Sequence, residues 1–74
     1  MEICKNKKTG EVFVYLEEKS DDSALMITPH GDVKRLENRL FTEPVEVDNG
    51  DSFLDQGSLT DVQYEVYMYY DIGR

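Results

Sequence analysis

The stretch "EVFVYLEE" at residues 11–18 decides the fold. It is rich in β-branched and aromatic residues, a composition typical of a β-strand. Two valines and a leucine alternate along one face, while Phe13 and Tyr15 lie on the other. Because both faces are apolar, we expect this strand to be covered on both sides.

Polar turns that end in glycine divide the chain around this strand. "KKTG" ends at Gly10, "TPHG" at Gly31 and "VDNG" at Gly50. Glycine adopts positive φ more easily than any other residue, as primed hairpin turns and bulged turns require. We therefore expect each segment to end a strand, with Gly10 and Gly31 at positive φ.

The segments that follow predict further short strands. "ALMIT" at residues 24–28 is one, and residues 33–41 are expected to form a short strand followed by a single helical turn. Residues 45–47 alternate valine with glutamate, as in a half-buried strand. The core expected from these strands consists of Val12, Val14, Leu16, Leu25, Ile27, Val45 and Val47.

A C-terminal helix is predicted in "SLTDVQYEVYMYYDIG" at residues 58–73. Thr60 and Gln63 have the spacing of a capping box, and Leu59 and Tyr64 have that of a hydrophobic staple. One apolar stripe recurs at the helical period and is expected to pack on the sheet. That stripe consists of Leu59, Val62, Val66, Tyr69 and Tyr70.

The partner of this stripe is predicted to be the second face of the strand at residues 11–18. Phe13 and Tyr15 lie on that face, beside Met26 of the neighbouring strand. Before the helix, "DSFLDQG" at residues 51–57 is expected to form one or two helical turns that stop at Gly57.

These elements predict a mainly β fold with a C-terminal helix. Short strands joined by hairpin turns must curl or be covered, because open sheet edges pair with other chains. We expect a small, strongly bent antiparallel sheet or an SH3-like barrel. Residues 1–74 are expected to form a single domain, with the barrel-like sheet at residues 1–47 and the helical segment at 51–72.

The order of parts resembles that of SH3-like small β-barrel proteins of unknown function. The resemblance covers residues 1–47 and includes a hairpin, a charged loop, a second hairpin at "ALMITPHGDVKRL", a single turn at "ENRLF" and a closing strand "PVEV". The paired tryptophans of SH3 domains that bind proline-rich peptides are missing, since the chain has no tryptophan. We therefore do not expect binding of proline-rich peptides. The sequence resembles a short bacterial protein of unknown function, and this resemblance implies no activity.

Charge and composition restrict the function classes. The 74 residues carry a net charge of −8, and residues 44–74 hold seven acids against one base. Such a field repels phosphate backbones and attracts basic surfaces. The sequence has no apolar run long enough to span a membrane, and we expect no leader. Its single cysteine, Cys4, cannot form an internal disulfide. We expect a soluble cytoplasmic protein that does not bind membranes.

The residues do not predict an enzyme, a metal site or a cofactor. His30 lies at the tip of the "TPHG" turn, where a solvated side chain is expected, and it lacks a second histidine or an adjacent nucleophile to form a catalytic set. The acidic loop at residues 48–55 superficially resembles a calcium site. It fails the EF-hand pattern, because Gly50 and Leu59 occupy positions that need oxygen ligands.

Two binding functions remain. A nucleic-acid-associated barrel would use Lys34, Arg35 and Arg39, with Tyr15 or Phe13 as the stacking aromatic, but the net charge of −8 opposes it. An acidic decoy that occupies a nucleic-acid-binding protein is a related alternative.

The leading prediction is an interaction module that binds a protein partner, or a second copy of itself, through the C-terminal helix. "YEVYMYY" at residues 64–70 holds four of the five tyrosines. Tyr64, Tyr67 and Met68 fall opposite the predicted stripe, and tyrosine and methionine are enriched in interfaces. The alternative is that the bent sheet simply surrounds the helix.

Overall fold

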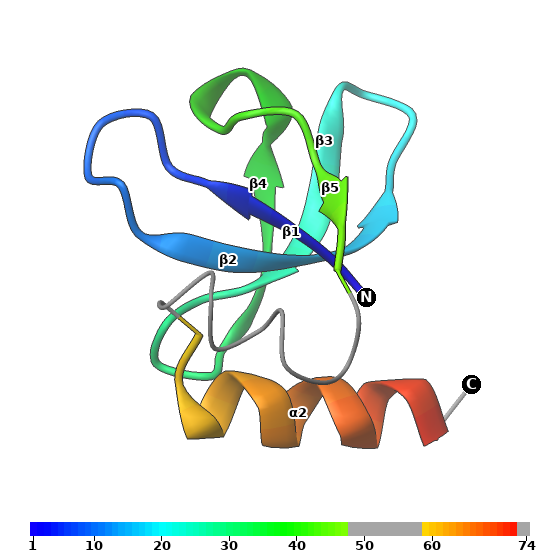
Figure 1. Ribbon diagram of the computed structural model, residues 1–74. Helices are drawn as coiled ribbons and strands as arrows, with labels where there is room; N and C mark the ends of the chain where they lie inside the picture. Colours follow the sequence, from blue (N-terminus) through cyan, green and yellow to red (C-terminus); the bar gives the residue numbers. More distant parts are fainter. Residues whose placement is uncertain (48–58, 73–74) are drawn as a thin grey trace.

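The computed structural model describes residues 1–47 and 59–72 and contains a five-stranded antiparallel sheet with one C-terminal helix (Figure 1). The strand order is β4-β3-β2-β1-β5. The elements are β1 (Glu2–Lys5), β2 (Val12–Glu18), β3 (Ser23–Ile27), β4 (Val33–Glu37), the 3-10 helix η1 (Asn38–Leu40), β5 (Val45–Glu46) and α2 (Asp61–Ile72). This confirms the expected fold class and the short strand followed by a helical turn.

The sheet bends strongly but does not close into a barrel. A register shift between Tyr15 and Glu17 interrupts the β2–β3 ladder, and such bulges increase local twist. Beyond η1 the chain returns to β1, where an isolated bridge joins Asn6 to Phe41. Figure 1 shows the resulting curl, in which β5 returns to the edge of the sheet and pairs antiparallel with β1.

Two of the predicted glycine turns lie in the described residues, and both are confirmed. Gly10 has a φ of 78° and Gly31 a φ of 90°. Gly31 closes its turn by donating its N–H to the Thr28 carbonyl across 2.8 Å. The Gly50 turn, the loop at residues 48–55 and the turns predicted at 51–57 lie outside the described residues.

Buried side chains form two clusters on opposite faces of the sheet. The first consists of Cys4, Phe13, Ala24, Met26 and Phe41, and the second of Ile3, Val12 and Val47. Four predicted core residues are buried, namely Val12, Val14, Ile27 and Val47. Leu16 and Leu25 are only half-buried, and Val45 is 51% exposed, so its assignment to the core was wrong.

The helix covers the face opposite to the one predicted. Leu59, which leads into α2, packs with Ile3 and Val12 of the second cluster. On the other face, Phe13 meets Phe41 edge to face, with ring centroids 4.9 Å apart. The curl of the sheet therefore fills the face that we assigned to the helix.

The capping box at the start of α2 is confirmed. Thr60 Oγ1 accepts the Gln63 N–H at 3.2 Å, and Gln63 Oε1 accepts the Thr60 N–H at 2.9 Å. Gln63 is also fully buried, because its amide donates to the carbonyl oxygens of Val12 and Ile27 at 2.9 and 3.1 Å. These bonds hold the helix to the sheet where β2 and β3 separate.

Because Gln63 is buried, the helix is rotated about its own axis relative to the orientation that the apolar stripe predicts. Val62 is 40% exposed and Tyr69 is 72% exposed, so the apolar stripe assigned to the sheet was wrong at these two positions. Val62 instead lies against the β3–β4 turn. A Cβ atom added to Gly31 of this turn would be only 2.8 Å from the Cγ2 atom of Val62. Val66 and Tyr70 are half-buried.

Candidate interaction surface

The outer face of α2 carries a contiguous apolar surface. Tyr64, Met68, Tyr69 and Ile72 line a shallow, open groove together with Glu65. Tyr69 and Ile72 are the most exposed large side chains on this face, at 72% and 77%. Residues spaced three and four apart share one side of a helix, so the groove follows directly from the helix phase that Gln63 sets. We call these four apolar residues the outer patch.

Acidic residues surround the outer patch. Asp61, Glu65 and Asp71 are exposed on α2, and the sequence of this helix contains no lysine or arginine. The helix therefore has an apolar outer face bordered by charge of one sign. This combination is complementary to an apolar surface with a basic rim.

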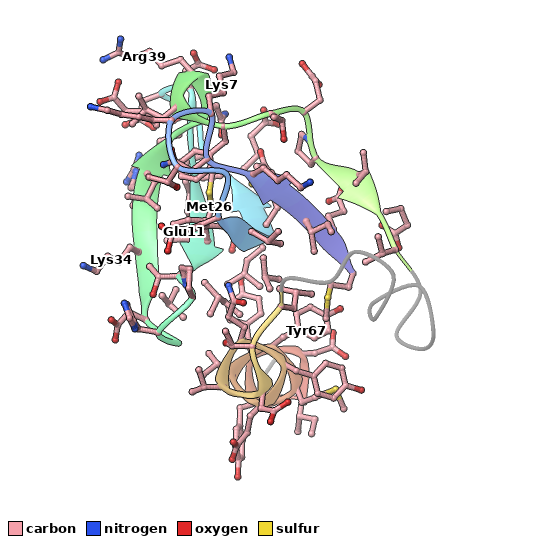
Figure 2. All side chains as sticks on the ribbon, turned by 60° about the vertical axis from the view of Figure 1, so that its left-hand side comes forward. Lys7, Glu11, Met26, Lys34, Arg39 and Tyr67 are labelled. Atoms are coloured by element: carbon pink, nitrogen blue, oxygen red, sulfur yellow. The ribbon has the colours of Figure 1, made fainter. Side chains whose placement is uncertain are left out.

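The structure brings two of the three predicted interface residues together. Tyr64 and Met68 share the outer patch, whereas Tyr67 is half-buried on the side of the helix that faces the sheet (Figure 2). There Tyr67 lines a second pocket with Met1 and Tyr15. The prediction that Tyr67 points outward was wrong, because the helix is rotated about its axis to bury Gln63.

Sequence reasoning missed Tyr69 and Ile72 as members of the outer patch. Both are apolar, and Tyr69 was placed in the stripe that packs on the sheet. The available signal was the capping box, since the Gln63 side chain of a box lies close to the helix start and can be buried there. Neighbouring Tyr70 instead reaches back to the sheet, where its hydroxyl donates to Glu17 Oε2 at 2.9 Å.

The basic residues proposed for nucleic-acid binding do not form one surface with an exposed aromatic ring. Arg35 pairs with Asp21 at 2.8 Å, and Arg39 pairs with Glu37 at 2.7 Å. Lys34 is exposed on β4, well away from Arg39 at the far end of the molecule (Figure 2). Successive strand residues point to opposite faces, so Lys34 and Arg35 diverge.

The aromatic candidates for base stacking are also poorly placed for it. Phe13 is buried against Phe41. Tyr15 is half-buried, and burial raises the pKa of its hydroxyl, with further increases from the charges of Glu18 and Glu2. Carboxylates beside a stacking residue repel a phosphate backbone, so this arrangement disfavours nucleic acid.

The single histidine is exposed to solvent, and the single cysteine is buried. His30 is exposed in the turn between β3 and β4, as expected. Cys4 is buried, its Sγ lies 3.8 Å from the Met26 sulfur, and burial raises the pKa of its thiol to about 11. Within residues 1–47 and 59–72, no group of three or more His, Cys, Asp or Glu side chains is arranged to hold a metal ion.

No helix in the described part of the chain is long and apolar enough to span a membrane. No protein-family model, curated protein or solved structure matches the sequence. We therefore infer function from the geometry and charge of this chain alone.

Proposed function

We propose that this protein is a non-enzymatic interaction module that binds a protein partner through the outer patch of α2. The carrying observation is the apolar groove lined by Tyr64, Met68, Tyr69 and Ile72. Exposed apolar side chains gathered on one helix face are typical of interaction sites, whereas isolated ones are common on any surface. An amphipathic helix laid in an apolar groove is a recurring mode of recognition.

The charge around the outer patch favours one kind of occupant. The helix residues Asp61, Glu65 and Asp71 would meet a rim of lysine or arginine side chains on the partner. A second copy of this chain would bring two molecules of net charge −8 together and place the same acids opposite one another. We therefore propose a different protein, with an apolar groove and a basic rim.

The proposal includes a cytoplasmic location and an SH3-like sheet. The buried free thiol of Cys4 suits a reducing compartment, where disulfides are rare. The 3-10 turn between β4 and β5 and the return of the chain to β1 support the SH3-like layout. The partner would then dock on the helix and not on the sheet.

Site-directed photocrosslinking in the source cell can test this function. A photoreactive phenylalanine derivative would replace Tyr69 in one variant and the exposed Lys8 in a control. We expect a protein to be crosslinked from position 69 and not from position 8. Equal crosslinking from both positions would contradict a specific surface.

Binding of the purified partner is then measured by calorimetry. A Tyr69→Ser and Ile72→Ser double variant should bind at least about tenfold more weakly, since truncating central interface side chains commonly costs more than 1 kcal/mol each. The matched control changes Val33 and Leu40 to serine, because both are exposed apolar residues elsewhere. Equal affinity of the two double variants would overturn the proposal, as would a wild-type homodimer in sedimentation that the helix substitutions dissociate.

A further inference from the structure

Strand β4 forms an open edge of the sheet. It pairs with β3 along its whole length without a register shift, and in Figure 2 this strand, which carries Lys34, runs along the outside of the molecule. The opposite edge strand, β5, is only two residues long and follows Pro44. Short strands and prolines keep an edge from pairing with another chain. β4 has neither device, because it is five residues long and its sequence, VKRLE, contains no proline.

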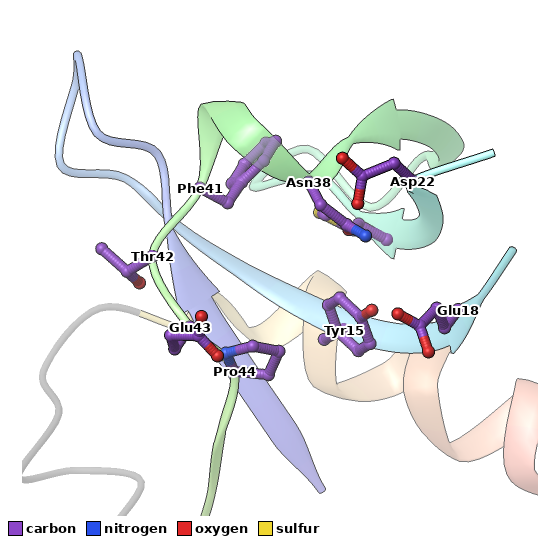
Figure 3. Close-up of a pocket in the computed structure, with 9 residues that line it drawn as sticks. Tyr15, Glu18, Asp22, Asn38, Phe41, Thr42, Glu43 and Pro44 are labelled. Atoms are coloured by element: carbon purple, nitrogen blue, oxygen red, sulfur yellow. The ribbon is translucent and has the colours of Figure 1, made fainter. Parts of the chain in front are cut away.

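Hydrogen bonds at the two ends of the β3–β4 ladder fix the direction of its main-chain groups. At one end the Thr28 N–H donates to the Asp32 carbonyl at 2.8 Å. At the other end the Asn38 N–H donates to the Asp22 carbonyl at 3.0 Å, and Figure 3 shows these two residues side by side. Opposite residues of an antiparallel pair alternate between hydrogen-bonded and non-hydrogen-bonded pairs. Both ends are hydrogen-bonded pairs, so the pairs between them can be assigned.

This alternation leaves every second residue of β4 with its main-chain groups on the open side. Lys34 and Leu36 form the hydrogen-bonded pairs with β3. The N–H and C=O groups of Val33, Arg35 and Glu37 therefore point away from β3. Within residues 1–47 and 59–72, no second strand pairs with this side of β4, and no turn or loop forms a backbone hydrogen bond with these groups. They can bond to another extended chain.

The side chains beside this edge differ on the two faces of the sheet. Val33 is opposite Ile27, which pairs with Val14 on the face of the second cluster, and Val33 is 45% exposed. Lys34 lies on the other face and extends into solvent (Figure 2). An added strand would therefore meet an apolar side chain on one face and a cation on the other.

The charge of this edge is opposite to that of the whole chain. Residues 33–39 hold three bases and one acid, whereas the chain has a net charge of −8. Arg35 and Arg39 are paired with Asp21 and Glu37, but Lys34 forms no salt bridge in the described part of the chain. An edge lysine disfavours apolar strands, and it attracts a carboxylate directly opposite. Lys34 therefore favours an acidic strand.

We propose that β4 accepts an extended, acidic segment of a protein partner as a further antiparallel strand of the sheet. In this mode of recognition, main-chain hydrogen bonds give affinity and alternate side chains give specificity. Opposite residues lie on the same face, so the segment has an acid opposite Lys34 and apolar residues opposite Val33 and Leu36. Its sequence pattern is apolar, any residue, acidic, apolar. This edge is separate from the outer patch, whose partner docks on α2.

Hydrogen exchange in the free protein tests the direction of the main-chain groups. The amides of Lys34 and Leu36 should exchange slowly, and those of Val33, Arg35 and Glu37 should exchange rapidly. Slow exchange of all five amides in dilute protein would show that the edge is already covered and would overturn the proposal. Protection that appears only at high protein concentration, together with a dimer in sedimentation, would also overturn it, because the added strand would then come from a second copy.

Nuclear magnetic resonance titration with the blocked peptide Thr-Leu-Thr-Glu-Val-Thr tests binding. Its third residue would lie opposite Arg35 and its fourth opposite Lys34. We expect saturable shifts of the Val33, Arg35 and Glu37 amide signals and none on α2. N-methylation of the third residue removes the N–H that would donate to the Arg35 carbonyl, so it should abolish these shifts.

The matched control peptide is N-methylated at its fourth residue. The N–H of that residue would point away from β4, so the control should bind as the parent peptide does. Equal loss of binding by both methylated peptides would contradict strand addition. The absence of saturable shifts with the parent peptide would overturn the proposal outright.

A proline in β4 tests the edge from the side of the protein. Glu37 has a φ of −75°, which proline adopts, and proline is tolerated in an edge strand where its nitrogen faces away from the ladder. Glu37→Pro should weaken binding of the parent peptide by about two- to tenfold, the range of one hydrogen bond. Glu37→Ala removes the same carboxylate but keeps the N–H, and it should bind more tightly than the proline variant. Equal affinity of the two variants would overturn the proposal.

A charge exchange tests the preference for an acidic segment. The wild type should bind the parent peptide about two- to fivefold more tightly than a peptide with glutamine in place of glutamate, the range of an exposed ion pair. Lys34→Gln should remove this preference, whereas Lys8→Gln, an exposed lysine in the β1–β2 turn, should retain it. A preference that persists in Lys34→Gln would overturn the assignment to an acidic segment.

Discussion

The side-chain amide of Gln63 donates a hydrogen bond to the backbone carbonyl of Val12 across 2.9 Å, between residues 51 positions apart in sequence. The same nitrogen donates to the Ile27 carbonyl at 3.1 Å, while the amide oxygen closes the capping box with Thr60. One fully buried side chain thus starts the helix and supplies donors where β2 and β3 separate. The outer patch faces solvent because this residue faces inward.

Replacing Gln63 with glutamate should destabilise the fold while preserving the capping box. Glutamate can still accept the Thr60 N–H, but it cannot donate to the carbonyls of Val12 and Ile27. Each of the two buried carbonyls left without a donor costs about 1 to 3 kcal/mol, so we expect a loss of about 2 to 6 kcal/mol in the free energy of unfolding. Urea denaturation measures this loss.

The exposed Glu65 provides the matched control for that substitution. Glu65→Gln is the reverse change on the outer side of the same helix, and exposed sites usually shift stability by about 0.5 kcal/mol or less. Similar midpoints for Gln63→Glu and the wild type would mean that the two carbonyls do not need the Gln63 donors.

Gly31→Ala should destabilise the protein more than Gly10→Ala. Both glycines have positive φ, which costs an L-residue about 1 to 2 kcal/mol. A Cβ at Gly10 would meet open space, whereas a Cβ at Gly31 would lie 2.8 Å from Val62 Cγ2 of the helix. Chemical denaturation of the two variants gives the difference.

A double-mutant cycle isolates the contact between the turn and the helix. In a Val62→Ala background the obstructing methyl groups are gone, so the cost of Gly31→Ala should fall to that of Gly10→Ala. An unchanged cost in that background would assign the whole effect to the backbone conformation.

Local patterns predicted the strands and turns well, because their determinants are close in sequence. Alternation in residues 11–18 predicts β2, and a glycine three residues after Thr28 predicts the turn at Gly31. The face covered by the helix could not be predicted in the same way. Both faces of β2 are apolar, and the choice depends on Phe41, which the curled chain brings back against Phe13.

The candidate interface was predicted only in part, for a related reason. A prediction from the helical period of apolar residues places Val62 and Tyr69 on the side of the helix that faces the sheet. It places Gln63 on the outer side. The observed phase instead depends on two distant carbonyls that only the folded sheet presents to Gln63. Tyr64 and Met68 lie on the outer face in both the predicted and the observed helix phase. Tyr67 was predicted to face outward but faces the sheet, and Tyr69 was predicted to face the sheet but faces outward.

Cys4 should react slowly with a thiol reagent at pH 8 in the native protein. Its thiol has a pKa of about 11 against an ordinary value of 9.0, which lowers the reactive thiolate fraction about a hundredfold. Burial beneath Phe41 and Met26 limits access further. The rate in urea gives the unfolded reference, and Phe41→Ala, which opens the cluster, should react faster than the wild type. Equal native and unfolded rates would show that Cys4 is accessible.

The carboxyl group of Asp21 should titrate well below its usual range. Hydrogen bonds from Arg35 and Ser23 lower its pKa from 3.8 to about 2. Because the folded pKa is the lower one, the resulting stabilisation is present above pH 3.8 and is lost as the pH falls toward 2. Arg35→Gln should raise the midpoint seen in the Asp21 carboxyl carbon resonance, and Arg39→Gln should not. Identical midpoints in both variants would contradict the role of Arg35.

Truncating Ile27 should cost far more stability than truncating Leu25 or Val45. Ile27 is fully buried, and Ile→Ala in a core typically costs about 2 to 5 kcal/mol. Leu25 is half-buried and should lose less, while Val45 is 51% exposed and should lose about 0.5 kcal/mol or less. Urea midpoints of the three alanine variants test this order. If Val45→Ala were as damaging as Ile27→Ala, the order expected from the burial of these side chains would be wrong.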